Sequence, residues 1–359
     1  MRRPQLIGRR RIGAPATGGR CLVPWLNERR QGVSTLSNKV KDSGAVGLYA
    51  QTSKEPTTLL GKLKDRFQKE WLFLLMMLPG LVLTAIFSYG PLYGIIMAFQ
   101  DYNPGLGFSG SPWVGMANFK LIFSQPAFLT TIYNTFFISL MKIIFQTLAS
   151  VVFALQLNEI RQNGPKRIFQ TIVYIPNFIS WVIMAGILTD ILGSTGIVNE
   201  ALMALGMKPV QFISNRAVFP WTMIVTDAWK TFGFGTVVYL ATMTSIDPEL
   251  YESALIDGAG RWRQTWSITL PMLVPIIILM TVLALGNVLS AGFDQIYNLY
   301  SPVVYPTGDI IDTYVYRLGL QNGKYAIGTA VGLFKSVVSS VLISSSLLIA
   351  YKFAGYKVF

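Results

Sequence analysis

Six long apolar runs dominate this sequence and limit what it can fold into. A helix needs about 20 mostly apolar residues to cross the hydrocarbon core of a bilayer, and each run reaches that length. The sequence therefore predicts an all-α membrane protein with six transmembrane helices. The runs lie at Leu72–Phe99, Tyr133–Leu157, Ile168–Leu192, Ala217–Met243, Pro271–Phe293 and Ala326–Phe353.

The composition supports a membrane location and argues against an enzyme. Only 13% of the residues are charged, about half the fraction in soluble domains. Histidine is absent, which removes the usual general base and the usual zinc ligand. Cys21 is the single cysteine, so no internal disulfide is possible, and no convincing pair of catalytic carboxylates is present. We expect no catalytic residue, no metal site and no cofactor bound by this chain.

The positive charge is distributed as expected for a membrane protein with its N-terminus in the cytoplasm. The net charge is +13, and 15 of the 30 Lys and Arg residues precede position 71. A basic segment before a membrane helix is retained in the cytoplasm, so we do not expect nucleic-acid binding. Length for length, the basic excess favours the loops near 158–167, 244–270 and 354–359 as the inner ones, with 100–132, 193–216 and 294–325 outside. An even number of spans places both termini in the cytoplasm.

The chain divides into a tail and one membrane domain. Residues 1–61 are predicted to be a basic, disordered N-terminal tail, because they are polar and lack steady periodicity. A transit peptide and a misassigned translation start are alternative explanations of this segment. Residues 62–359 form the transmembrane domain, and no loop in it is long enough for a further domain.

The inner loop between the fourth and fifth runs, residues 244–270, carries clear helix signals. Asp247 is a good N-cap, Pro248 suits the first helical position, and Glu249 complements the helix dipole. Gly258 and Gly260 end this short helix and permit a sharp turn. A second short helix leads on to the next span. We expect two short helices with a glycine elbow that project into the cytoplasm.

Small residues on the first of these helices leave room for another protein to approach. Ser253, Ala254 and Ala259 lie beside Gly258. An amphipathic hairpin lying on the lipid surface is the alternative interpretation, and the pattern alone leaves both open.

The loop also resembles a known motif. Glu252-Ser-Ala-Leu-Ile-Asp-Gly258-Ala, followed by Ile268-Thr-Leu-Pro271, is similar to the Glu-Ala-Ala loop of ATP-binding-cassette (ABC) importer permeases. Ser253 is the only departure in the core, and the Asp-Gly-Ala variant is typical of the sugar-importing branch. Further similarity covers roughly residues 62–359 and points to permeases for oligosaccharides or polysaccharide fragments. It includes Pro91–Phe99, Ser111–Phe119, Asn134-Thr-Phe and Tyr174–Phe178.

The resemblance implies a type-I importer permease fold in a bacterial inner membrane. The loop would be a coupling helix in a cleft of a separate ATPase subunit, where Glu252 pairs with a basic group and Gly258 allows the bend. ATP and Mg would lie on that ATPase, since no Gly-x-x-x-x-Gly-Lys-Ser/Thr motif exists here. Further partners would be a second homologous permease and a solute-binding protein. The coupling-loop residues would be Glu252, Ser253, Ala254, Asp257, Gly258, Ala259, Leu270 and Pro271.

Other transport functions remain as rival hypotheses. An ABC permease for a peptide, an amino acid or an anion belongs to the same broad class. A secondary transporter is a rival of another class, but its inner loop would have no reason to bind an ATPase.

Charged residues inside the runs are candidates for function, because they are costly in lipid. Asp227 and Lys230 lie three residues apart, as in a helical ion pair, and either line a sugar path or join packed helices. Lys142 and Lys335 either extend towards the interface or contact a partner subunit. The substrate-path candidates are Asp227, Trp229, Lys230, Trp181, Ser336 and Ser340.

Local features in the third and sixth runs also have two interpretations each. The Pro176–Asn177 break suits either a cavity wall or a packing kink. Gly328 and Gly332 permit close helix packing. The hydroxyls of Ser336, Ser340 and Ser344 either line a wet path or bond to carbonyls of their own helix.

Overall fold

The computed structural model describes residues 59–160 and 162–354. It divides the chain into two units, Met1–Leu83 and Thr84–Phe359. In the first unit, α2 (Leu59–Thr84) is a single helix that continues the charged lead-in into the first apolar run. The predicted tail up to residue 58 lies outside the described residues, and its disorder stays a prediction.

Helices account for nearly all the regular structure among the described residues of the second unit. An isolated bridge between Gln100 and Trp113 is the one β-type pairing in that part. After a π-helical turn (Ala85–Tyr89) and a 3-10 helix (Gly90–Phe99), the first half contains α3 (Gly107–Gly110), α4 (Ala117–Phe123), α5 (Pro126–Glu159), α6 (Asn163–Phe178), α7 (Trp181–Leu192) and α8 (Ile197–Ala204). The second half contains α9 (Phe219–Thr244), α10 (Pro248–Ile256), α11 (Arg261–Gln264), a π-helical turn (Thr265–Thr269), α12 (Leu270–Leu285), α13 (Phe293–Leu299), a 3-10 turn (Pro302–Val304), α14 (Tyr305–Gly308), α15 (Ile311–Val315), a π-helical segment (Tyr316–Gln321) and α16 (Tyr325–Ala354).

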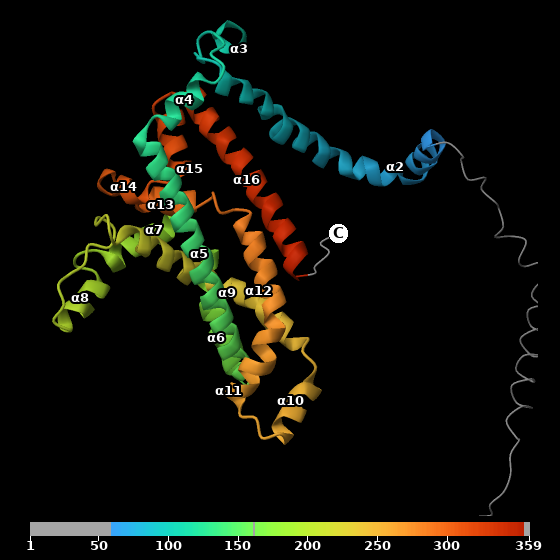
Figure 1. The fold of residues 1–359 in the computed structure, drawn as a ribbon, viewed down its shortest axis with the longest axis vertical. Helices are drawn as coiled ribbons and strands as arrows, with labels where there is room; N and C mark the ends of the chain where they lie inside the picture. The colour runs from blue at the N-terminus through green and yellow to red at the C-terminus, as the bar shows by residue number, and fades with distance from the viewer. Residues whose placement is uncertain (1–58, 161, 355–359) are drawn as a thin grey trace, which may run out of the picture. The chain divides into compact units, whose positions relative to one another are not determined.

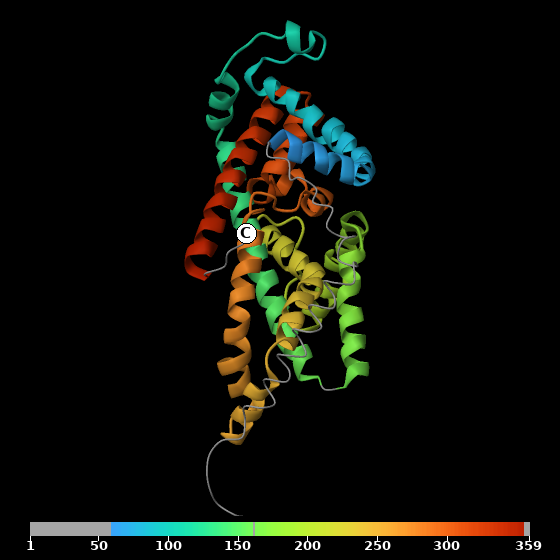
Figure 2. The same ribbon diagram turned by 90° about the vertical axis from the view of Figure 1, so that its right-hand side faces the viewer.

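The long helix α5 is central to the second unit. It packs along α9 and contributes to each of three buried apolar clusters, through Phe128, Ile138 and Ala154. Figures 1 and 2 show α4 near one end of α5, and α10 and α11 near the other. The predicted inner loop is therefore held at one end of the helical bundle.

Five helical stretches in the described residues are long and apolar enough to cross a membrane: Trp71–Phe99, Pro126–Glu159, Trp181–Ala204, Arg261–Leu285 and Tyr325–Leu348. The predicted fourth span corresponds to α9, which falls outside this set. Its 26 residues still give a length of about 39 Å, and both its charges are turned towards other helices. Six spans therefore remain a prediction that is consistent with the structure.

The third predicted span was wrong in its placement. The sequence predicted one helix over Ile168–Leu192, whereas α6 ends at Phe178 and α7 begins at Trp181, and the stretch long enough to cross runs over Trp181–Ala204. The break follows Pro176, as expected, but falls at Ile179 and Ser180. Ser180 has an extended backbone, and its Oγ accepts a hydrogen bond from the Ile183 N–H at 3.4 Å. The serine cap therefore fixes where the new helix starts.

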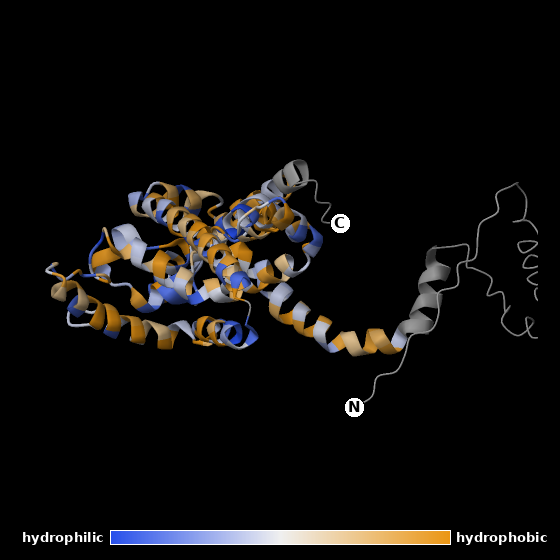
Figure 3. Cartoon of the chain, turned by 90° about the horizontal axis from the view of Figure 1, so that it is seen from below, coloured by the Kyte–Doolittle hydropathy of each residue, from blue (hydrophilic) through white to orange (hydrophobic). Residues whose placement is uncertain are grey.

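The outer faces of the helices are apolar, as a lipid-facing surface requires. Hydrophobic colour continues around the helices in Figure 3, and Val152, Phe234 and Val341 are among the exposed large apolar residues. On α16, a Cβ atom on Gly328 would lie 2.8 Å from the Cα of Gly319. Gly328 therefore permits close packing, whereas nothing lies within 4 Å of such an atom on Gly332.

Candidate functional site

The start of α10 has the cap that the sequence predicted. The Asp247 Oδ1 accepts a hydrogen bond from the Glu249 N–H at 3.0 Å, and Pro248 occupies the first turn. Glu249 adds an acidic side chain at the same end, where it favours the helix dipole. Local chemistry thus fixes this helix even though it projects from the bundle.

The end of α10 depends on one glycine. Gly258 has φ +75°, a left-handed conformation that residues with a Cβ rarely adopt. The Ala259 N–H donates to the Ala254 carbonyl at 2.8 Å, and the Gly258 N–H donates to the Leu255 carbonyl at 3.1 Å. These two bonds form the Schellman ending of a helix. Gly260 has φ −67°, so only Gly258 needs to be glycine for the elbow.

Two contacts hold this loop to the bundle, and a third fixes the shape of the loop itself. The Tyr251 hydroxyl lies 2.9 Å from the Thr269 hydroxyl, which is buried just before α12. The Gln264 Nε2 donates to the Ala259 carbonyl at 2.9 Å. Arg261 lies 3.5 Å from the Glu159 carboxylate at the end of α5, but both side chains are exposed. Such an exposed pair contributes at most about 1 kcal/mol, so the two hydrogen bonds at Tyr251 and Gln264 do more to define the loop.

The outward face of α10 is acidic and small. Glu252, Ser253 and Asp257 are exposed, while Ala254 and Ala259 are half-buried. Ile256 keeps 87% of its surface exposed, which is unusual for an apolar residue. Leu255 is 67% exposed next to Ile256, and an exposed apolar patch bordered by polar residues is suited to contact with another protein. Leu270 and Pro271 lie at the start of α12, away from this face.

The second short helix has a different character. Trp262 is 75% and Trp266 is 56% exposed, and their ring centroids lie 6.0 Å apart. Tryptophan favours the membrane–water interface. The lipid-surface interpretation therefore fits α11, whereas α10 presents a face suited to protein.

Lys142 is the centre of a buried polar cluster. Its Nζ donates to the Ala291 carbonyl at 2.7 Å and to the Gln295 Oε1, and lies 3.5 Å from the Asp227 Oδ1. The Gln295 Nε2 in turn donates to the Met223 carbonyl at 2.9 Å. The cluster joins α5, α9 and α13, so Lys142 neither extends to the interface nor awaits a partner subunit.

The predicted pairing of Asp227 with Lys230 was wrong, because Asp227 faces Lys142 instead. The Lys230 Nζ donates to the Asn177 carbonyl at 3.0 Å, next to the break between α6 and α7, and lies 5.2 Å from the centre of the Trp181 ring. The break thus supplies the acceptor that a buried ammonium group requires. Lys335 is paired as well, at 2.5 Å from the Asp312 Oδ1.

A cavity of about 220 Å³ opens beside the Lys142 cluster. Its polar lining comes from α5, α9 and the non-helical segment 286–292. Polar side chains around a cavity inside a bundle indicate a place where a polar solute is accommodated. The polar residues of this lining are Ser139, Lys142, Gln146, Asp227, Asn287 and Ser290.

The other path candidates do not gather at this cavity. Trp229 is 45% exposed. The Ser336 and Ser340 hydroxyls donate to the carbonyls four residues earlier, both at 2.9 Å, as does that of Ser344 at 2.8 Å. Of the six candidates only Asp227 lines the cavity. Lys230 is buried beside Trp181 at the break between α6 and α7. Within the described ranges, no three His, Cys, Asp or Glu side chains gather as metal ligands would.

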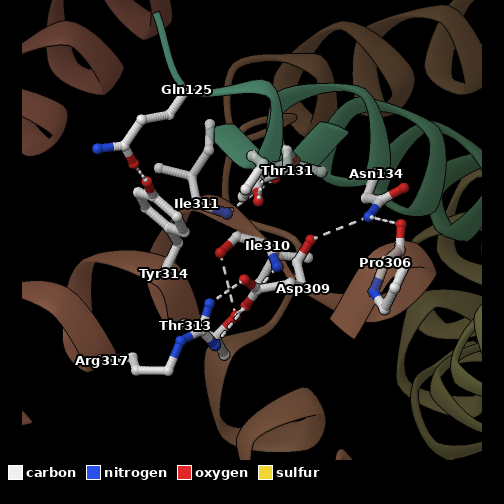
Figure 4. Close-up of polar contacts among 12 residues, drawn as sticks. Gln125, Thr131, Asn134, Pro306, Asp309, Ile310, Ile311, Thr313, Tyr314 and Arg317 are labelled. Carbon is white, nitrogen blue, oxygen red and sulfur yellow. Dashed lines mark hydrogen bonds and ion pairs between the residues drawn. The ribbon is translucent and has the colours of Figure 1, made fainter. Parts of the chain in front are cut away.

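A second buried network, between α5 and the 294–325 loop, was missed by sequence analysis (Figure 4). The Asn134 Nδ2 donates to the Pro306 carbonyl at 3.1 Å. The Asp309 carboxylate accepts hydrogen bonds from the Thr313 hydroxyl at 2.7 Å and from the Arg317 guanidinium. Asp309, Thr313 and Arg317 recur every four residues, and this spacing was the available signal. The network makes the loop a folded part of the bundle.

The chain is similar to known transport proteins. Residues 146–354, which contain the inner loop, match the family model described as binding-protein-dependent transport system inner membrane component. The chain is 41% identical to Protein LplB of Bacillus subtilis (strain 168), over 79% of this chain and 89% of the relative. It is 38% identical to the polygalacturonan/rhamnogalacturonan transport system permease protein YteP of the same strain, over 80% of this chain and 89% of the relative.

A solved structure is similar over the same region. It is that of the bacterial alginate ABC transporter in complex with alginate pentasaccharide-bound periplasmic protein. The matched chain has 38% identity and a TM-score of 0.74, and the match covers 82% of this chain and 98% of that chain.

Proposed function

The chain belongs to the family of binding-protein-dependent transport system inner membrane components, and from this premise we propose that it passes oligosaccharides across the membrane. It is the permease subunit of an ABC importer and has the type-I importer permease fold. Its helices are apolar on their outer faces and polar around an interior cavity. A solute path and a coupling loop are therefore the two functional parts to assign.

The observation that carries the sugar assignment is the similarity to the alginate transporter and to YteP at 38% identity. The first of these proteins is named for the transport of alginate and the second for the transport of polygalacturonan and rhamnogalacturonan. Uronate-containing oligosaccharides are therefore the first substrates to test. Nothing in the cavity opposes this class, since its lining combines a paired lysine with amide and hydroxyl groups.

The coupling part of the proposal assigns α10 to a cleft in a separate ATPase subunit. The support is the exposed face with Glu252, and the glycine elbow at Gly258 that sets its direction. Glu252 would pair with a basic group of the ATPase. ATP and Mg belong to that subunit, and ATP shifts the permease between two states because it binds one of them better.

The substrate path is proposed to follow the cavity next to Lys142, which Asp227 lines, and to pass on to Lys230 and Trp181 at the break between α6 and α7. We leave Trp229 out of the path because its side chain is exposed. Ser336 and Ser340 are left out because their hydroxyls bond to carbonyls of their own helix. A second homologous permease and a solute-binding protein complete the importer, and both termini of this chain face the cytoplasm. The periplasmic protein in the alginate transporter complex supports the binding-protein partner.

The test is uptake by proteoliposomes that contain this chain, its permease partner and its ATPase, with the cognate solute-binding protein outside. We expect ATP-dependent uptake of alginate or galacturonate oligosaccharides. Peptides, amino acids and glycerol phosphate form the contrasting panel. Uptake of one of these and of no saccharide would refute the sugar assignment and support the rival ABC permease.

A further inference from the structure

A row of aromatic rings runs along one side of α13 and continues past its end. Phe293, Tyr297 and Tyr300 recur at the spacing of one helix face, and Tyr305 follows them. The ring centroids lie 5.2 Å apart for Phe293 and Tyr297, 6.0 Å for Tyr297 and Tyr300, and 5.0 Å for Tyr300 and Tyr305. The Tyr316 ring lies next to Tyr297, with their ring centroids 4.9 Å apart. We call these five residues the tyrosine row.

Only Tyr300 of the row packs against an apolar core cluster; none of the five belongs to the fully buried core. The buried residues of α13 are Gln295, Ile296 and Leu299. All five members of the row are half-buried, so each ring packs against neighbours and keeps some accessible surface. The five rings come from α13 and from the segments that follow it, so they form one continuous half-buried aromatic surface.

One end of the row is held in place by a charged residue. The Arg317 guanidinium lies 4.2 Å from the centre of the Tyr305 ring and is fixed by the Asp309 carboxylate. This ion pair leaves Arg317 without a free charge to offer a ligand. Burial raises the pKa of the Tyr300 hydroxyl to about 12, so that group stays neutral in physiological conditions. The row is therefore rigid, aromatic and uncharged.

Its position links the row to the interior cavity. Phe293 directly follows Gly292, which lines the cavity together with Asn287 and Ser290. The charge pattern of the loops assigns residues 294–325 to the outer side. The row therefore continues from the cavity into the loop on the side where substrate arrives.

We propose that the tyrosine row is a binding track for the pyranose rings of the oligosaccharide on its way to the cavity. This inference rests on the proposed sugar function. A pyranose has an apolar C–H face and a polar rim, which match the apolar face and the hydroxyl of tyrosine. Because the row is uncharged, it binds acidic and neutral saccharides alike, and selection by charge occurs elsewhere in the importer.

The test uses the complete importer in proteoliposomes, with radiolabelled alginate pentasaccharide and maltopentaose as probes. Tyr297→Leu removes a ring, whereas Tyr297→Phe keeps it and removes only the hydroxyl. For each probe that the wild type transports, we expect kcat/KM of Tyr297→Leu to fall about three- to tenfold, the worth of one aromatic contact. Tyr297→Phe should stay within about twofold, because stacking is kept. Tyr300→Leu and Tyr300→Phe repeat the comparison should Tyr297→Leu not assemble.

The outcomes separate the row from the function on which it rests. Wild-type uptake with unchanged kcat/KM in the leucine variants would overturn the track and keep the sugar function. Loss of the second permease from the purified leucine variants, with the phenylalanine variants intact, would overturn the track and make the row a subunit interface. Wild type that transports no saccharide, galacturonate oligosaccharides included, would overturn both. A residue with only a structural role would lower the amount of complex rather than kcat/KM.

Discussion

The Lys142 ammonium group on α5 lies 3.5 Å from the Asp227 carboxylate on α9, inside the bundle and beside the cavity. Each charge is costly at this depth alone. The pair also supports an irregular backbone, since Lys142 donates to the Ala291 carbonyl in the segment between α12 and α13. One lysine thus neutralises a buried carboxylate and satisfies the carbonyl of a helix break.

Removing only one member of this pair should destabilise the protein strongly. Lys142→Met leaves Asp227 as an uncompensated buried charge, and we expect a loss of about 3–5 kcal/mol. The double variant Lys142→Met/Asp227→Leu should recover part of that loss. Thermal unfolding of the purified protein in detergent measures both. If the losses caused by Lys142→Met alone and by Asp227→Leu alone add up to the loss in the double variant, Lys142 and Asp227 do not act as a pair.

The glycine elbow offers a matched comparison between two positions. An added Cβ meets nothing within 4 Å at either Gly258 or Gly260, so the substitutions differ only in backbone conformation. Gly258→Ala must adopt φ +75° at a cost of about 1–2 kcal/mol, whereas Gly260→Ala fits its existing φ of −67°. We expect the Gly258 variant to bind the ATPase about five- to thirtyfold more weakly, measured by titration in detergent. Equal affinities for the two variants would show that the elbow does not set the direction of α10.

The orientation of the loops is testable with two isosteric changes in a Cys21→Ser background. Ser109 and Ser267 are both exposed, so a cysteine at either position should be accessible without disturbing the fold. A membrane-impermeant maleimide applied outside should label Ser109→Cys and leave Ser267→Cys unlabelled until the membrane is opened, because basic loops stay inside. The reverse labelling would invert the topology. Ser109 is preferable to the neighbouring Gly107, because the φ of +65° at Gly107 disfavours a cysteine.

Local signals in the sequence were read correctly, and long-range pairings were not. The Asp247 cap and the Gly258 ending each depend on residues within one helical turn, so the pattern contained them. The partner of Asp227 depends on how α5 packs against α9, and the sequence offered Lys230 as the nearer but wrong choice. The division between α6 and α7 was expected at Pro176 and occurs at Ser180, because a side-chain cap rather than the proline starts the second helix.

The buried network of the outer loop shows another feature that was not predicted from the sequence. Asp309, Thr313 and Arg317 show a helical spacing, but they lie in short helical segments and not in a run long enough to cross a membrane, so the spacing was not noticed. Gln264 is a poor control position for substitutions in the inner loop. The Gln264 side chain bonds to the Ala259 carbonyl, so its removal would disturb the elbow, and Gly260 serves better.

The central claim is that α10 couples this permease to an ATPase through Glu252, and substrate-stimulated ATP hydrolysis in proteoliposomes tests it most directly. Glu252→Ala is compared with Glu200→Ala, which removes an exposed glutamate from α8, outside the inner loop. Loss of one partner of an ion pair in a protein cleft costs about 3–5 kcal/mol. We predict that Glu252→Ala inserts normally but loses co-purification of the ATPase and stimulation by loaded binding protein, while Glu200→Ala keeps both. Full docking and full stimulation in Glu252→Ala would contradict the account, and α10 would then be no coupling element.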